Sequence, residues 1–272
     1  MLGPRHYLPC PRMRNPTPAM THLKPTLMPD DIASLERATL DAVAPPEVQE
    51  IPGWMLPLDR STIGRAKSAV PLRHTDLDPE QLSDIEVRYQ AWGIAAAFRV
   101  ADVPGLNAVH HRLRTMGYAP NQPTLVQIGS VAHVRALPVA AIVQIDRHPS
   151  AAWASVYTAP GFDPVDGAHR VQALSRNPHA VYASVQSDAQ PLAAGTASLS
   201  QGWASVHGMR TVPSARGQGL ASQVLVGLAD VAAARGFERL FLQVEEANTS
   251  ALALYSRAGF STAWRYHYWC RS

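Results

Sequence analysis

The stretch Met209-Arg-Thr-Val-Pro-Ser-Ala-Arg-Gly-Gln-Gly-Leu-Ala-Ser222 decides the fold, because it joins a strand to a helix through a glycine-bearing turn. Gly217 and Gly219 permit a tight bend and carry no Cβ that would block a ligand. The helix that follows has apolar residues at helical spacing and is predicted to end at Gly236. Its first N–H groups and the positive end of its dipole form an anion site. The pattern alone is equally typical of a phosphate site and of an ordinary strand-to-helix connection.

The composition indicates a soluble globular protein. The chain has 272 residues, which suffices for one large domain or two modest ones, and 46% of them are hydrophobic. The net charge of +3 comes without any Lys/Arg run, and the apolar runs are shorter than a membrane span. Neither a nucleic-acid nor a membrane partner is therefore expected. Cys10 and Cys270 lie at opposite ends of the chain, so we expect free thiols in a cytoplasmic protein and no metal site.

Residues 1–28 are expected to form a disordered tail, because they are rich in proline and lack both a periodic pattern and the apolar core of a signal peptide. Met1 and Met20 both remain candidate starts.

Hydrophobic periodicity in the rest of the chain predicts a mixed α/β fold. Helices are expected at 30–42, 78–93, 106–116, 164–174, 220–236 and 249–258. Strands are expected at 54–58, 66–72, 95–100, 123–128, 138–145, 179–186, 191–199, 203–211, 240–244 and 264–269.

A second cluster lies after the glycine turn. Asn248 is a good N-cap for the helix that follows it, and Tyr255 lies about two turns further on, on the same side as Leu252. A capping Asn and a packed Tyr would explain the cluster equally well.

Together the two clusters resemble the acyl-CoA-binding core of the GNAT superfamily of N-acetyltransferases. The phosphate-loop pattern of that family, Gln/Arg-x-x-Gly-x-Gly/Ala, corresponds to residues 216–221, and its Asn, Tyr and Gly-Phe element corresponds to Asn248, Tyr255 and 259–260. The resemblance covers about residues 150–272.

The resemblance implies a fold and a cofactor. The fold would consist of two GNAT-like lobes, each a mixed, mostly antiparallel sheet flanked by helices. Residues 29–148 would form a degenerate lobe and residues 149–272 the catalytic lobe. Acetyl-CoA would be the co-substrate, held by these residues: Met209, Arg210, Thr211, Arg216, Gly217, Gln218, Gly219, Leu220, Ala221, Ser222, Asn248 and Tyr255.

The resemblance also implies roles. Strand backbone at Met209 and Thr211 would pair with pantetheine, and an N–H near Met209 would polarise the acetyl carbonyl. Amides of 217–222 would hold the diphosphate, Asn248 would bind the cofactor arm or a water, and Tyr255 would protonate the departing thiolate.

The chain departs from the family pattern at the positions expected to hold the general base. The positions where many members carry Glu hold Ser205 or His207, and Gln243. Glu245 is the nearest carboxylate, His207 has a suitable ordinary pKa, and a water chain without a dedicated base is a third possibility. Without a base, an α-amine is easier to deprotonate near neutral pH than a lysine amine.

An internal repeat is indicated, because residues 110–118 and 252–260 are both helix ends followed by glycine and an aromatic residue, although this construction is common enough to arise by coincidence. The first copy has no glycine between Gly64 and Gly93 and places Leu113 where Tyr255 lies. We therefore expect it to bind no acyl-CoA and to help shape the acceptor pocket, together with the loop 157–167.

The predicted function is acetyl transfer to a primary amine, on a small molecule or a peptide, by direct attack. A non-catalytic acyl-CoA sensor is one alternative, and transfer of another acyl group or from an aminoacyl donor is a second. The chain is expected to be a monomer or a homodimer.

Overall fold

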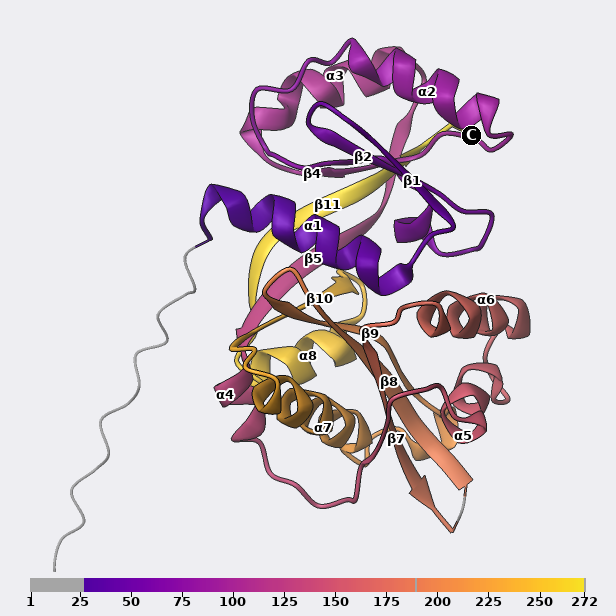
Figure 1. Ribbon diagram of the computed structural model, residues 1–272, viewed down its shortest axis with the longest axis vertical. Helices are drawn as coiled ribbons and strands as arrows, with labels where there is room; N and C mark the ends of the chain where they lie inside the picture. Colours follow the sequence, from indigo (N-terminus) through magenta and orange to yellow (C-terminus); the bar gives the residue numbers. More distant parts are fainter. Residues whose placement is uncertain (1–26, 189, 272) are drawn as a thin grey trace, which may run out of the picture.

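The computed structural model describes residues 27–188 and 190–271 (Figure 1). Its helices are α1 (Pro29–Val43), α2 (Gln81–Ala91), α3 (Asn107–Thr115), α4 (Val131–Arg135), α5 (Ala151–Ser155), α6 (Pro164–Ser175), α7 (Leu220–Ala234) and α8 (Thr249–Arg257). Its strands are β1 (Glu47–Ile51), β2 (Trp54–Leu58), β3 (Val70–Pro71), β4 (Phe98–Ala101), β5 (Ala119–Ser130), β6 (Gln144–Asp146), β7 (Ala180–Ser187), β8 (Gln190–Ser200), β9 (Trp203–Thr211), β10 (Arg239–Glu245) and β11 (Ser261–Cys270).

The main sheet has eight strands in the order β4-β11-β5-β10-β9-β8-β7-β6, and β1-β2-β3 form a second, smaller sheet. Within the eight-stranded sheet all neighbours are antiparallel except β9 and β10, which are parallel. The predicted mixed, mostly antiparallel α/β fold is confirmed.

The two halves of the chain exchange their last strands. β5, from the first half, lies between β10 and β11, while β11, from the second half, lies between β5 and β4. These two long strands run from one lobe to the other (Figure 1). The eight-stranded sheet therefore combines strands from both sides of the domain boundary that was expected between residues 148 and 149. That boundary stays a prediction.

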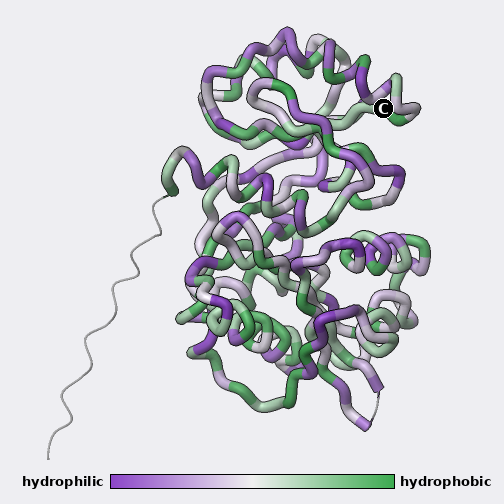
Figure 2. The backbone as a smooth tube through the Cα atoms, in the orientation of Figure 1, coloured by the Kyte–Doolittle hydropathy of each residue, from purple (hydrophilic) through white to green (hydrophobic). Residues whose placement is uncertain are grey.

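The largest hydrophobic core also combines residues from both halves of the chain. This core joins Trp54 and Phe98 of the first half to Trp203 and Phe241 of the second. Another core packs α7 on β7 to β10. Green, hydrophobic colouring predominates along α7 (Figure 2), as its sequence of Leu, Val and Ala suggests.

Several predicted elements differ in extent. The strand expected at 66–72 is wrong for most of its length, because residues 64–66 form a 3₁₀ turn in which the Ser68 hydroxyl donates to the Gly64 carbonyl at 2.7 Å. The strand expected from residue 138 begins only at Gln144, because the N–H groups of Ala140 and Ala141 donate to the Gln223 side chain instead of a neighbouring strand.

The helix expected from Asp78 begins at Gln81, because the Asp78 carboxylate accepts from the Glu80 N–H in the preceding turn. The short elements β1, α4 and α5 were not predicted. Most of the expected tail, with Cys10 and Met20, lies outside the described residues. Cys270 is a free thiol.

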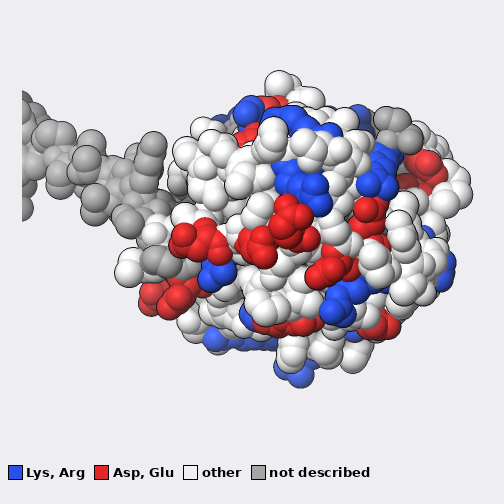
Figure 3. Space-filling view, turned by 90° about the horizontal axis from the view of Figure 1, so that it is seen from above, with Lys and Arg blue, Asp and Glu red and all other residues white. Residues whose placement is uncertain are grey.

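No described helix combines the length and hydropathy needed to cross a membrane. The face of the molecule shown in Figure 3 carries basic and acidic side chains interspersed.

Candidate active site

The parallel pairing of β9 and β10 covers only the first part of each strand. It ends at Val206 and Leu242, although β9 continues to Thr211 and β10 to Glu245. Beyond that point β9 stays with β8 and β10 stays with β5. The two strands therefore splay apart at their carboxyl ends, and the opening between them exposes strand backbone to a ligand.

A β-bulge lies on β9 at the start of this opening. The register with β8 shifts between Ala194 and Thr196, so that Gly208 and Met209 both lie opposite Gly195. The Tyr157 hydroxyl donates to the Gly208 carbonyl at 2.7 Å, and the Trp153 indole N–H donates to the Gly195 carbonyl at 3.1 Å. Two buried aromatic residues thus anchor the bulge on both strands.

Glycine suits both bulge positions. Gly208 has φ +63°, and a Cβ there would lie 2.7 Å from the Tyr157 hydroxyl. A Cβ on Gly195 would lie 2.5 Å from the Met209 sulfur. A side chain at either position would displace its neighbours, so glycine suits this path of the backbone.

The turn before α7 is open and rich in unpaired donors. Gly217 and Gly219 have φ +79° and +75°, and a Cβ added at either would meet no atom within 4 Å. The backbone N–H groups of 217–221 have no acceptor among the described residues. With the positive end of the α7 dipole, these donors suit a diphosphate. Their role as a phosphate loop stays a prediction.

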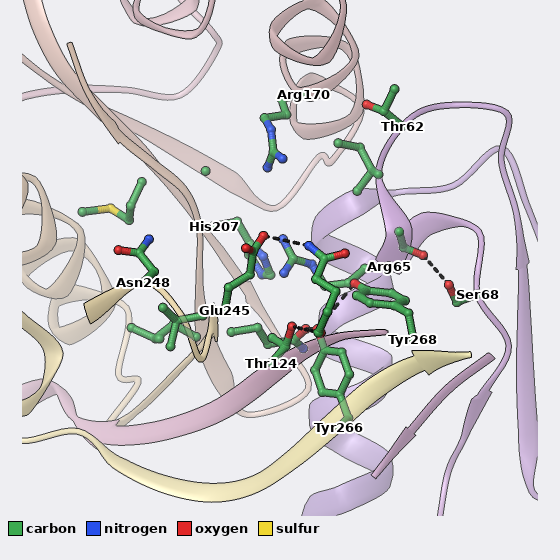
Figure 4. A pocket seen from close by; sticks show the side chains of 18 of the residues that line it. Thr62, Arg65, Ser68, Thr124, Arg170, His207, Glu245, Asn248, Tyr266 and Tyr268 are labelled. Atoms are coloured by element: carbon green, nitrogen blue, oxygen red, sulfur yellow. Dashed lines mark hydrogen bonds between the residues drawn. The ribbon is translucent and has the colours of Figure 1, made fainter. Parts of the chain in front are cut away.

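A pocket of about 440 Å³ extends from the splayed strands to the first half of the chain (Figure 4). The second half contributes Val206 to Met209, Leu242 to Glu245, Asn248, Ala251 and Tyr255, and α6 contributes Arg170. The opposite wall consists of residues 62–65, Lys67, Ser68, Ala97, Asn121, Gln122, Thr124, Tyr266, Tyr268 and Cys270.

Tyr255 and Asn248 both line this pocket, and their roles toward a cofactor stay predictions. The Asn248 side chain accepts from the Ala251 N–H at 3.2 Å, so it is the N-cap of α8. Tyr255 is 6% exposed and packs against Phe260. Burial raises the pKa of the Tyr255 phenol to about 12, so this group is protonated at neutral pH.

His207 is a buried neutral base on the pocket wall. Its side chain is 3% exposed, and its Nε2 has no hydrogen-bond partner in the described structure. Burial lowers the pKa of His207 well below the usual value, and the positive charge of Arg65 lowers it further. The imidazole is therefore unprotonated at neutral pH and can accept a proton, although it is a weak base.

Glu245 and Gln243 differ in their availability. The Glu245 side chain is exposed, and its carboxylate accepts from the Gln122 amide at 2.7 Å. Gln243 is fully engaged, since its amide donates to Thr39 and its carbonyl accepts from Tyr266. Glu245 is the one carboxylate among the described residues that line this pocket.

Two of the other predicted residues have side chains engaged elsewhere. The Arg210 guanidinium donates to the Tyr157 carbonyl and forms a 3.2 Å ion pair with Asp166. Arg216 lies over the Phe162 ring at 5.8 Å. Thr211 pairs with Ala193 on β8. The Arg210 side chain is therefore committed to other partners, and its backbone remains for a cofactor.

The first half repeats this arrangement without an anion site. A parallel bridge joins Ala69 to Phe98, as β9 pairs with β10. The turn that follows, before α2, carries Asp76, Asp78 and Glu80, whose charges would repel a phosphate. Leu113, which corresponds to Tyr255, is fully buried.

The bulge residues Gly195 and Gly208, the anchor Trp153 and the pocket residue Arg65 were not singled out from the sequence. Tyr157 was expected only as one end of the loop 157–167 that would shape the acceptor pocket, and no residue of that loop lines the pocket described here. A glycine inside the apolar strand 203–211 was the available signal for the bulge. No pattern in the sequence indicated Arg65, because the residues that surround it in the pocket lie far away in the chain.

The splayed strands, the bulge and the glycine turn define the chain as a member of the GNAT superfamily of acyltransferases. More narrowly, the chain belongs to the family described as "Probable histone acetyltransferase Rv0428c C-terminal", which matches residues 30–269. The resemblance predicted from the two motifs is confirmed.

Similar proteins agree with this assignment. A segment of 76 residues, 28% of the chain, is 37% identical to the uncharacterized N-acetyltransferase YobR of Bacillus subtilis and spans 31% of that protein. A GCN5-related N-acetyltransferase from Kribbella flavida has the same fold, with a TM-score of 0.66, 17% identity, and coverage of 88% of this chain and 95% of that one. A tandem GNAT protein from the clavulanic acid biosynthesis pathway matches with a TM-score of 0.59 and 13% identity, over 88% of this chain and 94% of that one.

Proposed function

We propose that the chain transfers an acetyl group from acetyl-CoA to a primary amine by direct attack. The observation that carries the proposal is the opening between β9 and β10, which runs from the bulge to a pocket lined by Tyr255. The unpaired N–H groups of 217–221 and the open space above Gly217 and Gly219 suit the diphosphate. The neutral pantetheine arm would lie along the opened strand backbone.

In the proposed step the amine nitrogen forms a bond to the acetyl carbon as the carbon–sulfur bond breaks. Backbone near Met209, aimed by the bulge, would stabilise the carbonyl oxygen. The amine loses one proton, for which His207, Glu245 or a water chain would be the acceptor. The thiolate gains one proton, so the products are an N-acetylamine and CoA.

Tyr255 would act on the leaving sulfur. Its pKa of about 12 exceeds the ~8.5 of an ordinary thiol, so complete proton transfer is uphill in the empty pocket. A neutral phenol still donates a hydrogen bond to the developing thiolate, and that bond strengthens as negative charge accumulates. This makes Tyr255 useful in the transition state more than in the substrate complex.

A Tyr255→Phe variant tests the proposal against a non-catalytic sensor. Phe preserves the packing on Phe260, and no hydrogen bond of the Tyr255 hydroxyl is lost within the described structure. We expect release of CoA in the presence of an amine panel to fall about 10²-fold, with acetyl-CoA affinity unchanged. Binding without amine-dependent CoA release in the wild-type protein would identify a sensor.

A further inference from the structure

The pocket wall contributed by the first half of the chain is basic. Arg65 and Lys67 line it from the segment between β2 and β3. Arg170, on the rim, forms an ion pair with Asp166 at 2.6 Å, a carboxylate that it shares with Arg210. Glu245 is the one carboxylate among the described residues that line the pocket, and it already accepts a hydrogen bond from Gln122. The positive charges of Arg65 and Lys67 therefore exceed the single negative charge of Glu245.

Arg65 is held in place by its turn. A Cβ on the preceding Gly64 would lie 2.8 Å from the Tyr268 ring, so this turn rests directly on the wall of the pocket. The Arg65 Nε is buried and has no hydrogen-bond partner, and Arg65 forms no ion pair with a described carboxylate. A half-buried guanidinium without an acceptor is unusual and costly unless a ligand completes it. Figure 4 shows Arg65 near His207, at the centre of the pocket.

The phosphates of CoA do not explain this charge. None of residues 216–222, the turn suited to the diphosphate, lines the pocket that contains Arg65. The parts of acetyl-CoA that would reach the pocket, pantetheine and the acetyl group, carry no charge. An anion beside Arg65 would therefore belong to the acceptor.

Resting on the function proposed above, we propose that the acceptor is a small amine that carries an anionic group, a carboxylate or a phosphate, and that Arg65 binds this group. The pocket volume of about 440 Å³, shared with the end of pantetheine, suits a molecule of amino-acid size. A lysine-rich peptide would bring further positive charge to a wall that already has an excess.

The first arm of the test uses the wild-type protein and acceptors that differ only in charge. Amino acids are compared with their carboxamides, and phosphoethanolamine with ethanolamine, so the two pairs separate a carboxylate from a phosphate. A lysine-rich peptide is the cationic arm. We expect kcat/KM for one of the anionic series to exceed that of its neutral partner roughly 10- to 100-fold. Equal rates within both pairs, or preference for the peptide, would overturn the inference.

The second arm uses Arg65→Gln and Arg65→Lys, with Arg88→Gln as a control on the exposed face of α2, outside the pocket. Arg65→Gln should remove the preference for the anionic acceptor, Arg65→Lys should restore part of it, and Arg88→Gln should change nothing. If Arg65 only lowered the pKa of the amine, Arg65→Gln would slow anionic and neutral acceptors equally, which would contradict the inference.

Measuring the binding of the acceptors directly tests this inference independently of the proposed acetyl transfer. Calorimetry of the same acceptors with the protein saturated with CoA needs no turnover. Binding of the anionic member that Arg65→Gln abolishes would support the inference even where acetyl transfer fails. Absence of binding by every anionic acceptor, or binding unaffected by Arg65→Gln, would overturn it even where neutral amines are acetylated.

Discussion

The Tyr157 hydroxyl donates a 2.7 Å hydrogen bond to the Gly208 carbonyl, and this bond connects the turn after α5 to the bulge of β9. Tyr157 is fully buried. The backbone conformation next to Met209 is thus held by an aromatic residue that lies about fifty positions earlier in the chain. This relationship makes the geometry of the opening experimentally accessible.

Tyr157→Phe should lower activity more than stability. Loss of the hydrogen bond leaves a carbonyl unsatisfied and should cost about 1–3 kcal/mol of unfolding free energy. A displaced bulge should lower kcat on the order of 10²-fold. The matched control is Tyr89→Phe, because the buried Tyr89 hydroxyl donates to the Pro57 carbonyl at 2.9 Å, in the first half of the chain and away from the bulge. Urea unfolding and CoA release measure both effects, and equal loss of activity in the two variants would contradict a special role for the bulge.

Gly217→Ala and Gly219→Ala should weaken acetyl-CoA binding. A left-handed φ costs an alanine about 1–2 kcal/mol, and the new methyl group would occupy the space proposed for the diphosphate. Gly236→Ala is the control, because Gly236 ends the same helix with φ +79° and equally open surroundings. Calorimetry should show an affinity loss of roughly tenfold or more, ~1.4 kcal/mol, only for the first two variants. Unchanged affinity in those two variants would place the diphosphate elsewhere.

Glu36 and Arg99 form a buried ion pair of 2.5 Å between α1 and β4, with side chains 4% and 1% exposed. Glu36→Gln should reduce the free energy of unfolding by about 3–5 kcal/mol, because it leaves the arginine charge uncompensated. The double variant Glu36→Leu with Arg99→Met removes both charges and should recover part of that loss. Urea midpoints give the comparison, and a double variant less stable than Glu36→Gln would show that the pair is net stabilising.

His74 should make the fold less stable in acid. Its ring lies edge-on to Trp264 at 5.0 Å, and burial lowers its pKa from 6.5 to about 4. Well above pH 6.5 the residue is neutral in both states and has no pH-dependent effect. As pH falls through 6.5 the unfolded state takes up a proton first, so stability declines until about pH 4, by at most about 3 kcal/mol.

His74→Phe keeps an aromatic ring against Trp264 and removes the titration. Chemical unfolding at pH 7.5 and pH 5 should show a smaller difference for this variant than for the wild-type protein. The same difference in both proteins would assign the acid sensitivity to other groups.

Local patterns were sufficient to predict the glycine turn at Gly217 and Gly219 and the cap at Asn248, because a few adjacent residues determine each of them. The exchange of β5 and β11 could not be predicted in this way, since strand partners are chosen by contacts across the whole sheet. The bulge depends on Tyr157 and Trp153, and the basic wall depends on a turn that meets the pocket only after the lobes have packed.

The strand expected at 66–72 shows the limit of periodicity in particular. The apolar residues are buried as expected, but the bond from Ser68 to the Gly64 carbonyl favours a turn. That turn then places Arg65 in the pocket. A local error in the prediction therefore hid the residue that we infer to select the acceptor.

The central claim is that one chain turns over acetyl-CoA at one site, between β9 and β10. The most direct measurement counts free CoA and N-acetylated amine by mass spectrometry in the same reaction, with calorimetry giving the number of acetyl-CoA molecules bound per chain. The account predicts equal amounts of the two products, one bound acetyl-CoA, and a roughly 10²-fold loss of both products with Tyr255→Phe. Two bound molecules per chain, or CoA release without acetylated amine, would contradict it.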